Sequence, residues 1–292
     1  MTRAGFVALA GRPNVGKSTL VNEIVGEKVA ITSDRAQTTR RAIRGVAQEG
    51  DSQLVLVDLP GFQRPRDRLT ERMQARVEHE LADSDAALML VNGEEGVGPG
   101  DRYIASLLER SSIPVVLAVN KCDRLDRART VAVLAEAGAL GCADEIFPVS
   151  ARTGEGVPEL AGHLAGLMPE GPYLFPPDSI SDQPTATLVA ELVREQAIRR
   201  TFQEVPHSVE VVVEEMETSS DVLRVRALLW VETESQKGIL VGRGGRMIKA
   251  IGTSARREIE KLLGEKVHLD LSVRVRGGWR GDDGLLDRLG ID

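Results

Sequence analysis

Residues 11–18 read GRPNVGKS, a match to the pattern G-x-x-x-x-G-K-[ST], and they stand between a short apolar run and a helical stretch. In that setting the glycines let backbone N–H groups point at phosphate oxygens at a helix N-terminus. Lys17 adds positive charge between the phosphates, and the Ser18 hydroxyl can bind Mg²⁺. The residue types and their spacing therefore predict a site for a nucleoside triphosphate and its magnesium ion.

A second set of polar residues predicts the base. The letters NKCD, at residues 120–123, follow a later apolar run. The Asp123 carboxylate can accept hydrogen bonds from N1–H and the exocyclic amine of guanine, a donor pair that adenine lacks. Asn120 can bond the purine N7, the Lys121 stem can lie over the ring, and backbone N–H groups of residues 150–152 can reach the guanine carbonyl oxygen. Because such a site rejects a base that cannot make these bonds, we predict GTP and GDP as ligands.

Two further segments are expected to respond to the γ-phosphate. The letters DLPG end an apolar run, which places Asp58 to hold Mg²⁺, mainly through water, and the Gly61 N–H to contact the γ-phosphate. Loss of that phosphate would release the loop that follows. In the polar segment SDRAQTTRR, Thr39 is the expected second protein ligand of Mg²⁺, with Thr38 as the alternative.

The residue after DLPG is Phe62, where many small GTPases carry a glutamine that positions the attacking water. Phenylalanine cannot do this, so slow intrinsic hydrolysis is predicted, with the water aligned by another group, partner or ion. One hypothesis is that Asn14 helps to hold a monovalent cation, K⁺, against the phosphates and so supplies positive charge there. The alternative role of Asn14 is to cap the loop.

Each task has its own set of expected residues. Lys17, Thr39 and Gly61 are expected to act in hydrolysis, and Ser18, Thr39 and Asp58 to hold Mg²⁺. The expected GTP-binding residues are Gly11, Arg12, Pro13, Asn14, Val15, Gly16, Lys17, Ser18, Thr19, Asp58, Leu59, Pro60, Gly61, Asn120, Lys121, Asp123, Ser150, Ala151 and Arg152.

Positive charge gathers near the C-terminus of an acidic chain. The whole chain has 37 Lys and Arg and 44 Asp and Glu, whereas residues 237–280 contain eleven Lys and Arg and only four Asp and Glu. Within this stretch the letters GRGG form a G-x-x-G loop between two helical stretches, which lets a sugar-phosphate chain approach the backbone closely, as in KH modules. RNA binding is predicted here, with the contacts Gly242, Arg243, Gly244, Gly245, Arg246 and Lys249.

The elements that must position these groups follow two patterns. Up to residue 168, short and nearly continuous apolar runs alternate with helical stretches, which is typical of a doubly wound α/β domain. Residues 169–184 hold five of the 13 prolines and are expected to form a linker. An α+β module in the order αββααβ follows over 185–280, and residues 281–292 are expected to form a C-terminal tail.

Composition excludes several classes of protein. Hydrophobic residues make up 42% of the chain and charged residues 28%, which excludes wholesale disorder. The two cysteines cannot form a disulfide framework and lack zinc-ligand spacing, which favours a reducing cytosol. No apolar run is long enough to span a membrane, and the N-terminus lacks a signal-peptide pattern. A cytoplasmic location is expected.

The chain resembles one family closely, the bacterial Era GTPases. The resemblance rests on GRPNVGKSTLVN, ITSDRAQTTR, DLPGF, EEGVGPGD, NKCD, SARTGEGV, PEGPYLFPPD, GRGG, VHLDLSVRV and GGW, in that order over nearly the whole chain. It implies a Ras-like P-loop GTPase domain, residues 1–168, followed by a smaller type II KH domain. It also implies binding near the 3′ end of 16S ribosomal RNA, a role in assembling the small (30S) ribosomal subunit, and a loose association with the inner face of the membrane. A monomer is expected. One departure is Asn92, where the family usually has Asp.

Two alternatives use the same residues differently. A metabolic P-loop kinase would also carry the phosphate loop, but NKCD and DLPG count against it. A membrane-associated regulatory GTPase would turn its basic module towards anionic lipid instead of RNA, although a G-x-x-G loop has no evident use in binding lipid.

Overall fold

The structure is a computed structural model that describes residues 1–33, 35, 37–62, 65–219 and 221–291. The chain divides into two compact units. Unit 1 comprises Met1–Ala30, Thr39–Arg66 and Thr70–Asp182, and unit 2 comprises Ile31–Thr38, Asp67–Leu69 and Gln183–Asp292. A short segment that follows the first helix therefore belongs to the C-terminal unit.

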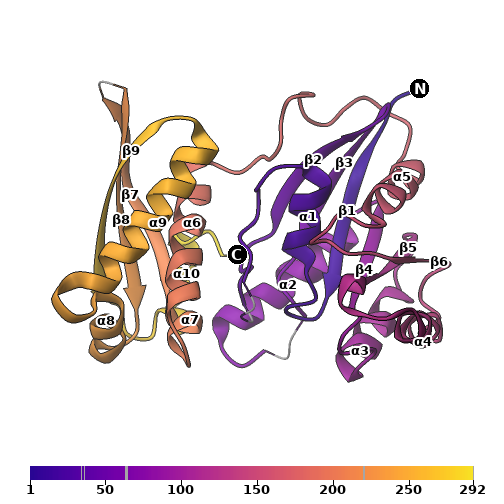
Figure 1. Ribbon diagram of the computed structural model, residues 1–292, viewed down its shortest axis with the longest axis horizontal. Coiled ribbons are helices and arrows are strands. Elements are labelled where there is room, and N and C mark those ends of the chain that lie inside the picture. The colour runs from indigo at the N-terminus through magenta and orange to yellow at the C-terminus, as the bar shows by residue number, and fades with distance from the viewer. Residues whose placement is uncertain (34, 36, 63–64, 220, 292) are drawn as a thin grey trace. The chain divides into compact units, whose positions relative to one another are not determined.

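A six-stranded sheet forms the centre of unit 1 (Figure 1), with the strand order β2-β3-β1-β4-β5-β6. Neighbouring strands are parallel except for β2 and β3, which are antiparallel. The strands are β1 (Arg3–Gly11), β2 (Ile43–Glu49), β3 (Ser52–Asp58), β4 (Ala86–Asn92), β5 (Val115–Asn120) and β6 (Glu145–Pro148). The helices are α1 (Lys17–Val25), α2 (Arg68–Ala82), α3 (Pro99–Leu108), α4 (Arg127–Gly138) and α5 (Val157–Leu167).

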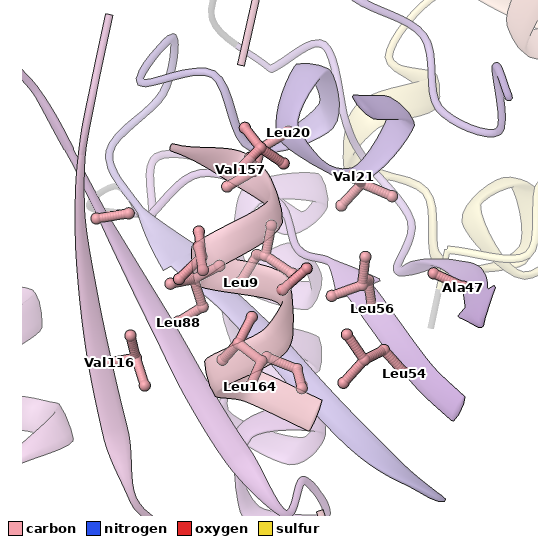
Figure 2. Close-up of a cluster of buried hydrophobic side chains, with 14 of the residues drawn as sticks. Leu9, Leu20, Val21, Ala47, Leu54, Leu56, Leu88, Val116, Val157 and Leu164 are labelled. Atoms are coloured by element: carbon pink, nitrogen blue, oxygen red, sulfur yellow. The ribbon is translucent and has the colours of Figure 1, made fainter. Parts of the chain in front are cut away.

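Helices cover both faces of this sheet, which explains why its central strands are apolar along their whole length. On one face α1 and α5 pack on the strands, and Figure 2 shows this cluster around Leu20, Leu88 and Leu164. On the other face α2, α3 and α4 contribute buried residues such as Val77 and Ile104. Strands β3 and β4 are buried at every position, as expected from their apolar runs.

The parallel arrangement brings the carboxyl ends of β1, β3 and β5 to one edge of the sheet, where ligands bind in folds of this kind. β1 ends at Gly11, β3 at Asp58 and β5 at Asn120. These residues begin the phosphate loop, DLPG and NKCD. The topology therefore gathers the three motifs, although they are far apart in sequence.

The edge strand β2 has no counterpart in the sequence expectations. Its residues, IRGVAQE, contain a glycine and end in polar residues, so they form no continuous apolar run. A Cβ at Gly45 would lie 2.8 Å from a methyl carbon of Val25 and 2.9 Å from one of Val21. Glycine at this position lets α1 lie close against β2.

The proline-rich residues 169–184 contain no helix, make one turn in which the Ser179 N–H donates to the Pro176 carbonyl, and lie along unit 1 as far as Asp182. The Val46 N–H donates to the Ile180 carbonyl at 2.9 Å. The Gln53 side chain accepts from the amides of residues 174 and 175 at 2.8 and 2.9 Å. Most of this segment is therefore fixed to unit 1 by hydrogen bonds.

Unit 2 packs helices on a three-stranded sheet of order β7-β8-β9, in which β7 and β8 are antiparallel and β8 and β9 are parallel. The strands are β7 (Glu210–Ser219), β8 (Val222–Val231) and β9 (Lys266–Val275). The helices are α6 (Thr185–Arg200), α7 (Val205–Ser208), α8 (Glu234–Val241), α9 (Arg246–Leu263) and α10 (Asp283–Arg288). The predicted order αββααβ is confirmed by α6, β7, β8, α8, α9 and β9, with α7 and α10 as short additions.

The segment between α1 and β2 belongs to unit 2 up to Thr38 and to unit 1 from Thr39 onwards. Within unit 2 the Glu195 carboxylate on α6 accepts from the N–H and hydroxyl of Thr32 at 3.0 and 3.3 Å. The fully buried Arg194 donates to the carbonyl of Thr38. Two adjacent residues of α6 therefore hold this segment.

Candidate functional site

The phosphate loop connects β1 to α1 and takes a shape that its residue types require. Gly16 is the N-cap of α1 with φ of 103°, and a Cβ there would lie 2.2 Å from Nδ2 of Asn120. Only glycine fits this position. Lys17 is buried, and its Nζ donates to the carbonyls of Gly11 and Arg12, both at 3.2 Å. The loop therefore curls around the lysine ammonium.

Burial controls the charge of Lys17. Removing the ammonium from water lowers the pKa of Lys17 to about 8, and the Asp58 carboxylate opposes this shift. A bound triphosphate would favour the protonated form, because it brings several negative charges beside the ammonium. The charge of Lys17 is thus coupled to occupation of the loop.

Three oxygen-bearing side chains of unit 1 meet beside the phosphate loop. Ser18 Oγ donates to Asp58 Oδ2 at 2.6 Å, and Thr39 Oγ1 donates to the same oxygen at 3.0 Å. The Thr38 hydroxyl instead donates to the carbonyl of Arg35 at 2.7 Å. A carboxylate and two hydroxyls are the hard oxygen ligands that Mg²⁺ prefers. The donor set fits this ion and favours Thr39 over Thr38 as its ligand.

The DLPG segment lies directly against the phosphate loop. A Cβ on Gly61 would fall 2.7 Å from the backbone nitrogen of Pro13, so a larger residue would clash with the loop. The next residue, Phe62, donates its N–H to the Gly11 carbonyl at 3.2 Å, and its side chain is buried in the core that includes α2 and α3. Phe62 is a packing residue, which agrees with the expectation that it does not position water.

Asn120 connects the NKCD segment to the loops on either side of it. Its Nδ2 donates to the carbonyl of Val15 at 2.8 Å. Its Oδ1 accepts from the N–H groups of Lys121 and Ala151 at 2.8 and 3.0 Å. One amide side chain thus fixes the phosphate loop, NKCD and the loop after β6 in a single arrangement.

The Asp123 carboxylate is held by two donors. Ser150 Oγ donates to Oδ1 at 2.7 Å, and the Arg152 guanidinium donates to Oδ2 at 2.5 Å. The Ser150 hydrogen bond, together with the charge of Arg152, lowers the pKa of Asp123 below its usual range. Asp123 is therefore ionised at neutral pH, as the acceptor of two guanine N–H groups must be.

The structure corrects the expectation for the backbone of Ser150. Its N–H donates to the carbonyl of Glu155 at 2.8 Å and closes the turn after β6, so it is not directed to a base. Ser150 contributes its hydroxyl to Asp123 instead. The side-chain contact of Arg152 with Asp123 was not predicted from the sequence. The opposite charges of these two residues, in two motifs assigned to the same base, could have indicated it.

The G-x-x-G loop joins α8 to α9 in unit 2. Gly242, Gly244 and Gly245 have φ values of 70°, 58° and 75°, a region that favours glycine. A Cβ on Gly242 would lie 2.9 Å from the Met247 nitrogen, whereas a Cβ on Gly244 or Gly245 would meet no atom of the described chain within 4 Å. The charged side chains of the loop and the start of α9 are exposed: Arg243, Arg246 and Lys249. This loop presents accessible backbone together with positive charge.

A doubly wound sheet with these three motifs, followed by an αββααβ unit with a G-x-x-G loop, defines a P-loop GTPase joined to a KH domain. Two family models agree: "50S ribosome-binding GTPase" matches residues 6–121, and "KH domain" matches residues 204–280. The chain belongs to the GTPase Era family. It is 45% identical over 296 residues to GTPase Era of Mycobacterium sp. (strain KMS), covering 99% of both chains. It is 44% identical over 291 residues to GTPase Era of Lactobacillus helveticus (strain DPC 4571), covering 99% of this chain and 96% of that one.

Solved structures match over the same length. Era of Aquifex aeolicus, bound to GDP and AlF4⁻, matches with a TM-score of 0.96 and 34% identity, covering 99% of both chains. A structure of Era in complex with MgGDPNP and nucleotides 1506–1542 of 16S ribosomal RNA matches with a TM-score of 0.96 and 35% identity, covering 100% of this chain and 99% of that one. The resemblance to Era is confirmed, and the chain is a GTPase. Within the described residues, no helix is long and apolar enough to cross a membrane.

Proposed function

We propose that this protein is a GTP-hydrolysing switch that binds 16S ribosomal RNA near its 3′ end and assists assembly of the small ribosomal subunit. The observation that carries the proposal is the exposed G-x-x-G loop, where Gly244 and Gly245 leave the backbone open beside Arg243 and Arg246. A phosphate chain can approach such a loop closely and meet positive charge there. The RNA complex of the related Era supports the choice of partner.

The nucleotide end of the proposal uses the residues gathered in unit 1. Lys17 would contact the β- and γ-phosphates, the Gly61 N–H the γ-phosphate, and Asp123 the guanine base. Ser18, Thr39 and Asp58 would hold Mg²⁺, which neutralises charge on the phosphates when bound. The MgGDPNP complex of the related Era supports this ion.

The switch itself would act through the segment that precedes β2. Thr39 lies with the proposed metal ligands in unit 1, while Thr38 is held by Arg194 on α6 of the RNA-binding unit. Presence of the γ-phosphate would therefore influence a segment on which both units depend. This arrangement supports coupling of the phosphate state to RNA affinity.

The experiment is binding of a 16S rRNA 3′-end oligonucleotide to the protein loaded with a GTP analogue, with GDP or with nothing. Gly244→Asp places a negative charge in the loop and is expected to abolish RNA binding while GTP hydrolysis continues. Gly264→Asp is the matched control, because Gly264 also has positive φ and open space around it but lies at the opposite end of α9. Equal RNA affinity of the two variants would refute the role of the loop.

The oligomeric state, the membrane alternative and the K⁺ hypothesis can be tested with the same protein. We expect a monomer that acts in the cytoplasm, and binding to anionic vesicles without binding to RNA would favour the membrane alternative. If Asn14 helps to hold K⁺, turnover falls when Na⁺ replaces K⁺ at equal ionic strength. Unchanged turnover would remove that role from Asn14.

A further inference from the structure

One motif has no part in the site described above, the segment GVGPGD that leads into α3. Asp101 of this segment is fully buried, and its Oδ2 lies 2.9 Å from Nε of Arg12, the second residue of the phosphate loop. Glu95 lies on the other side of the same guanidinium, with Oε2 3.0 Å from Nη1. Two carboxylates from the segment after β4 therefore flank one arginine of the phosphate loop.

The backbone around the arginine is shaped to receive it. A Cβ on Gly100 would lie 2.7 Å from Cδ of Arg12, and a Cβ on Gly98 would lie 3.7 Å from its Cζ. The Gly98 N–H donates at 2.8 Å to the Asp101 oxygen that faces Arg12. Gly100 thus gives the arginine stem room, whereas a side chain at Gly98 would make only an ordinary contact with it. The N-terminal turn of α3 fixes the carboxylate.

The other carboxylate is also fixed. Nδ2 of Asn92, the last residue of β4, donates to Glu95 Oε1 at 2.8 Å. Oδ1 of Asn92 accepts from the Glu94 N–H at 3.1 Å, which shapes the turn that carries Glu95. The partners of Arg12 are therefore held by their own segment.

We infer that Arg12 is a positioning residue for GTP hydrolysis, held by Asp101 and Glu95 so that the outer part of the phosphate loop keeps one shape. The Arg12 carbonyl accepts from Lys17, and the next residue, Pro13, lies against Gly61. A shift of Arg12 would therefore reach both the lysine and the DLPG segment. Small displacements of this kind lower the rate of a reaction that depends on alignment.

The same contacts argue against direct contact of Arg12 with phosphate. Its guanidinium faces two carboxylates, one of them buried, so its charge is already compensated. Leaving Asp101 for a phosphate would strand a buried negative charge without its cation. The arginine acts through the loop backbone, unlike a catalytic arginine that contacts the transferred phosphoryl group.

The test compares Arg12→Gln, Asp101→Asn and the double variant in GTP turnover and GDP affinity. Asp101→Asn keeps an oxygen for the Gly98 N–H and removes only the charge. We expect each single variant to lower kcat about tenfold or more. Because the two residues act as a unit, kcat of the double variant should be no more than about twofold below that of the slower single variant. GDP affinity is expected to stay within about threefold of the unchanged protein, since the α- and β-phosphates are bound further along the loop.

Three results would overturn the inference. A fully active Asp101→Asn beside a slow Arg12→Gln would mean that Arg12 contacts phosphate itself. Parallel loss of kcat and GDP affinity would mean that the pair merely holds the whole site together. Wild-type turnover in both variants would mean that the pair has no part in hydrolysis.

Two further variants serve as a control for the substitution of a neighbouring residue and as a substitute should Arg12→Gln not fold. Arg102→Gln, next to Asp101 on an exposed face of α3, is the matched control and should be unchanged. Arg12→Lys keeps a cation beside Asp101 if the glutamine variant fails to fold, and it should lose turnover to a smaller degree because it lacks the planar fork. The inference rests on the nucleotide site and not on RNA binding. A failed nucleotide site would appear as absent GDP binding by the unchanged protein.

Discussion

Replacing Asp123 by asparagine should change the base that the protein accepts. The carboxylate now accepts from Ser150 and Arg152 and would accept two N–H groups of guanine. Asparagine loses one charge-assisted hydrogen bond, worth about 1.5–3 kcal/mol, and turns an amine towards a guanine donor, which costs about 1–3 kcal/mol more. Loss of the exposed Arg152 ion pair adds little. Together these effects lower GTP affinity by roughly 10² to 10⁴.

Xanthine nucleotides provide the decisive comparison, because xanthine carries a carbonyl where guanine has its amine. The Asp123→Asn amide can donate to that carbonyl, so affinity for xanthosine triphosphate should rise as GTP affinity falls, both measured by calorimetry. Asp126→Asn is the control, since Asp126 caps α4 by accepting from Arg129 at 2.7 Å and asparagine caps equally well. GTP affinity of Asp123→Asn within about threefold of wild type would refute this account of the base site.

Three other perturbations have definite outcomes. GTP affinity should fall as pH rises above about 8, because neutral Lys17 must then take up a proton to bind phosphate. Titrations with a fluorescent nucleotide should show this pH dependence in wild type but not in Lys17→Met. A wild-type affinity that does not change with pH would contradict the prediction. Trp279→Ala removes a fully buried ring whose Nε1 donates to the Ser208 carbonyl at 3.1 Å. The free energy of unfolding of unit 2, measured with urea, should therefore fall by about 3–5 kcal/mol, and a fall below about 1 kcal/mol would contradict this packing role. Gly242→Ala forces a Cβ against Met247, so RNA binding should weaken while GTP turnover continues, and unchanged RNA affinity in a filter-binding assay would exclude the clash.

The central strands of unit 1 were predictable because burial on both faces leaves a continuous apolar signature, as in β4. The edge strand β2 was not, because one side of an edge carries polar residues and Gly45 interrupts the pattern. The four-residue helix α7 and the six-residue helix α10 are too short to show a helical period. Sequence thus identifies strands that form an unbroken apolar run, and it misses the interrupted edge strand β2 and the shortest helices.

The motifs of the nucleotide site were predictable because each has a fixed local spacing. The contacts between motifs were not, because they depend on how distant segments meet. Arg12 and Asp101 are neighbours only because β1 and β4 are adjacent and parallel. The Ser150 amide was misassigned because its real partner, Glu155, is chosen by the turn that the chain makes after β6.

The division of the chain at Thr38 has a consequence for the order in which the protein matures. Translation starts at the N-terminus, and a domain generally folds once its own residues are available. Every residue of unit 1 has been made by Asp182, but segment 31–38 belongs with α6, and the sheet of unit 2 is complete only when β9 has been added. A nascent chain therefore acquires its phosphate loop and guanine motif first, and secures the segment before Thr39 only after α6 has been synthesised. The segment before Thr39, which is made early, thus waits for a helix that is made only after unit 1 is complete.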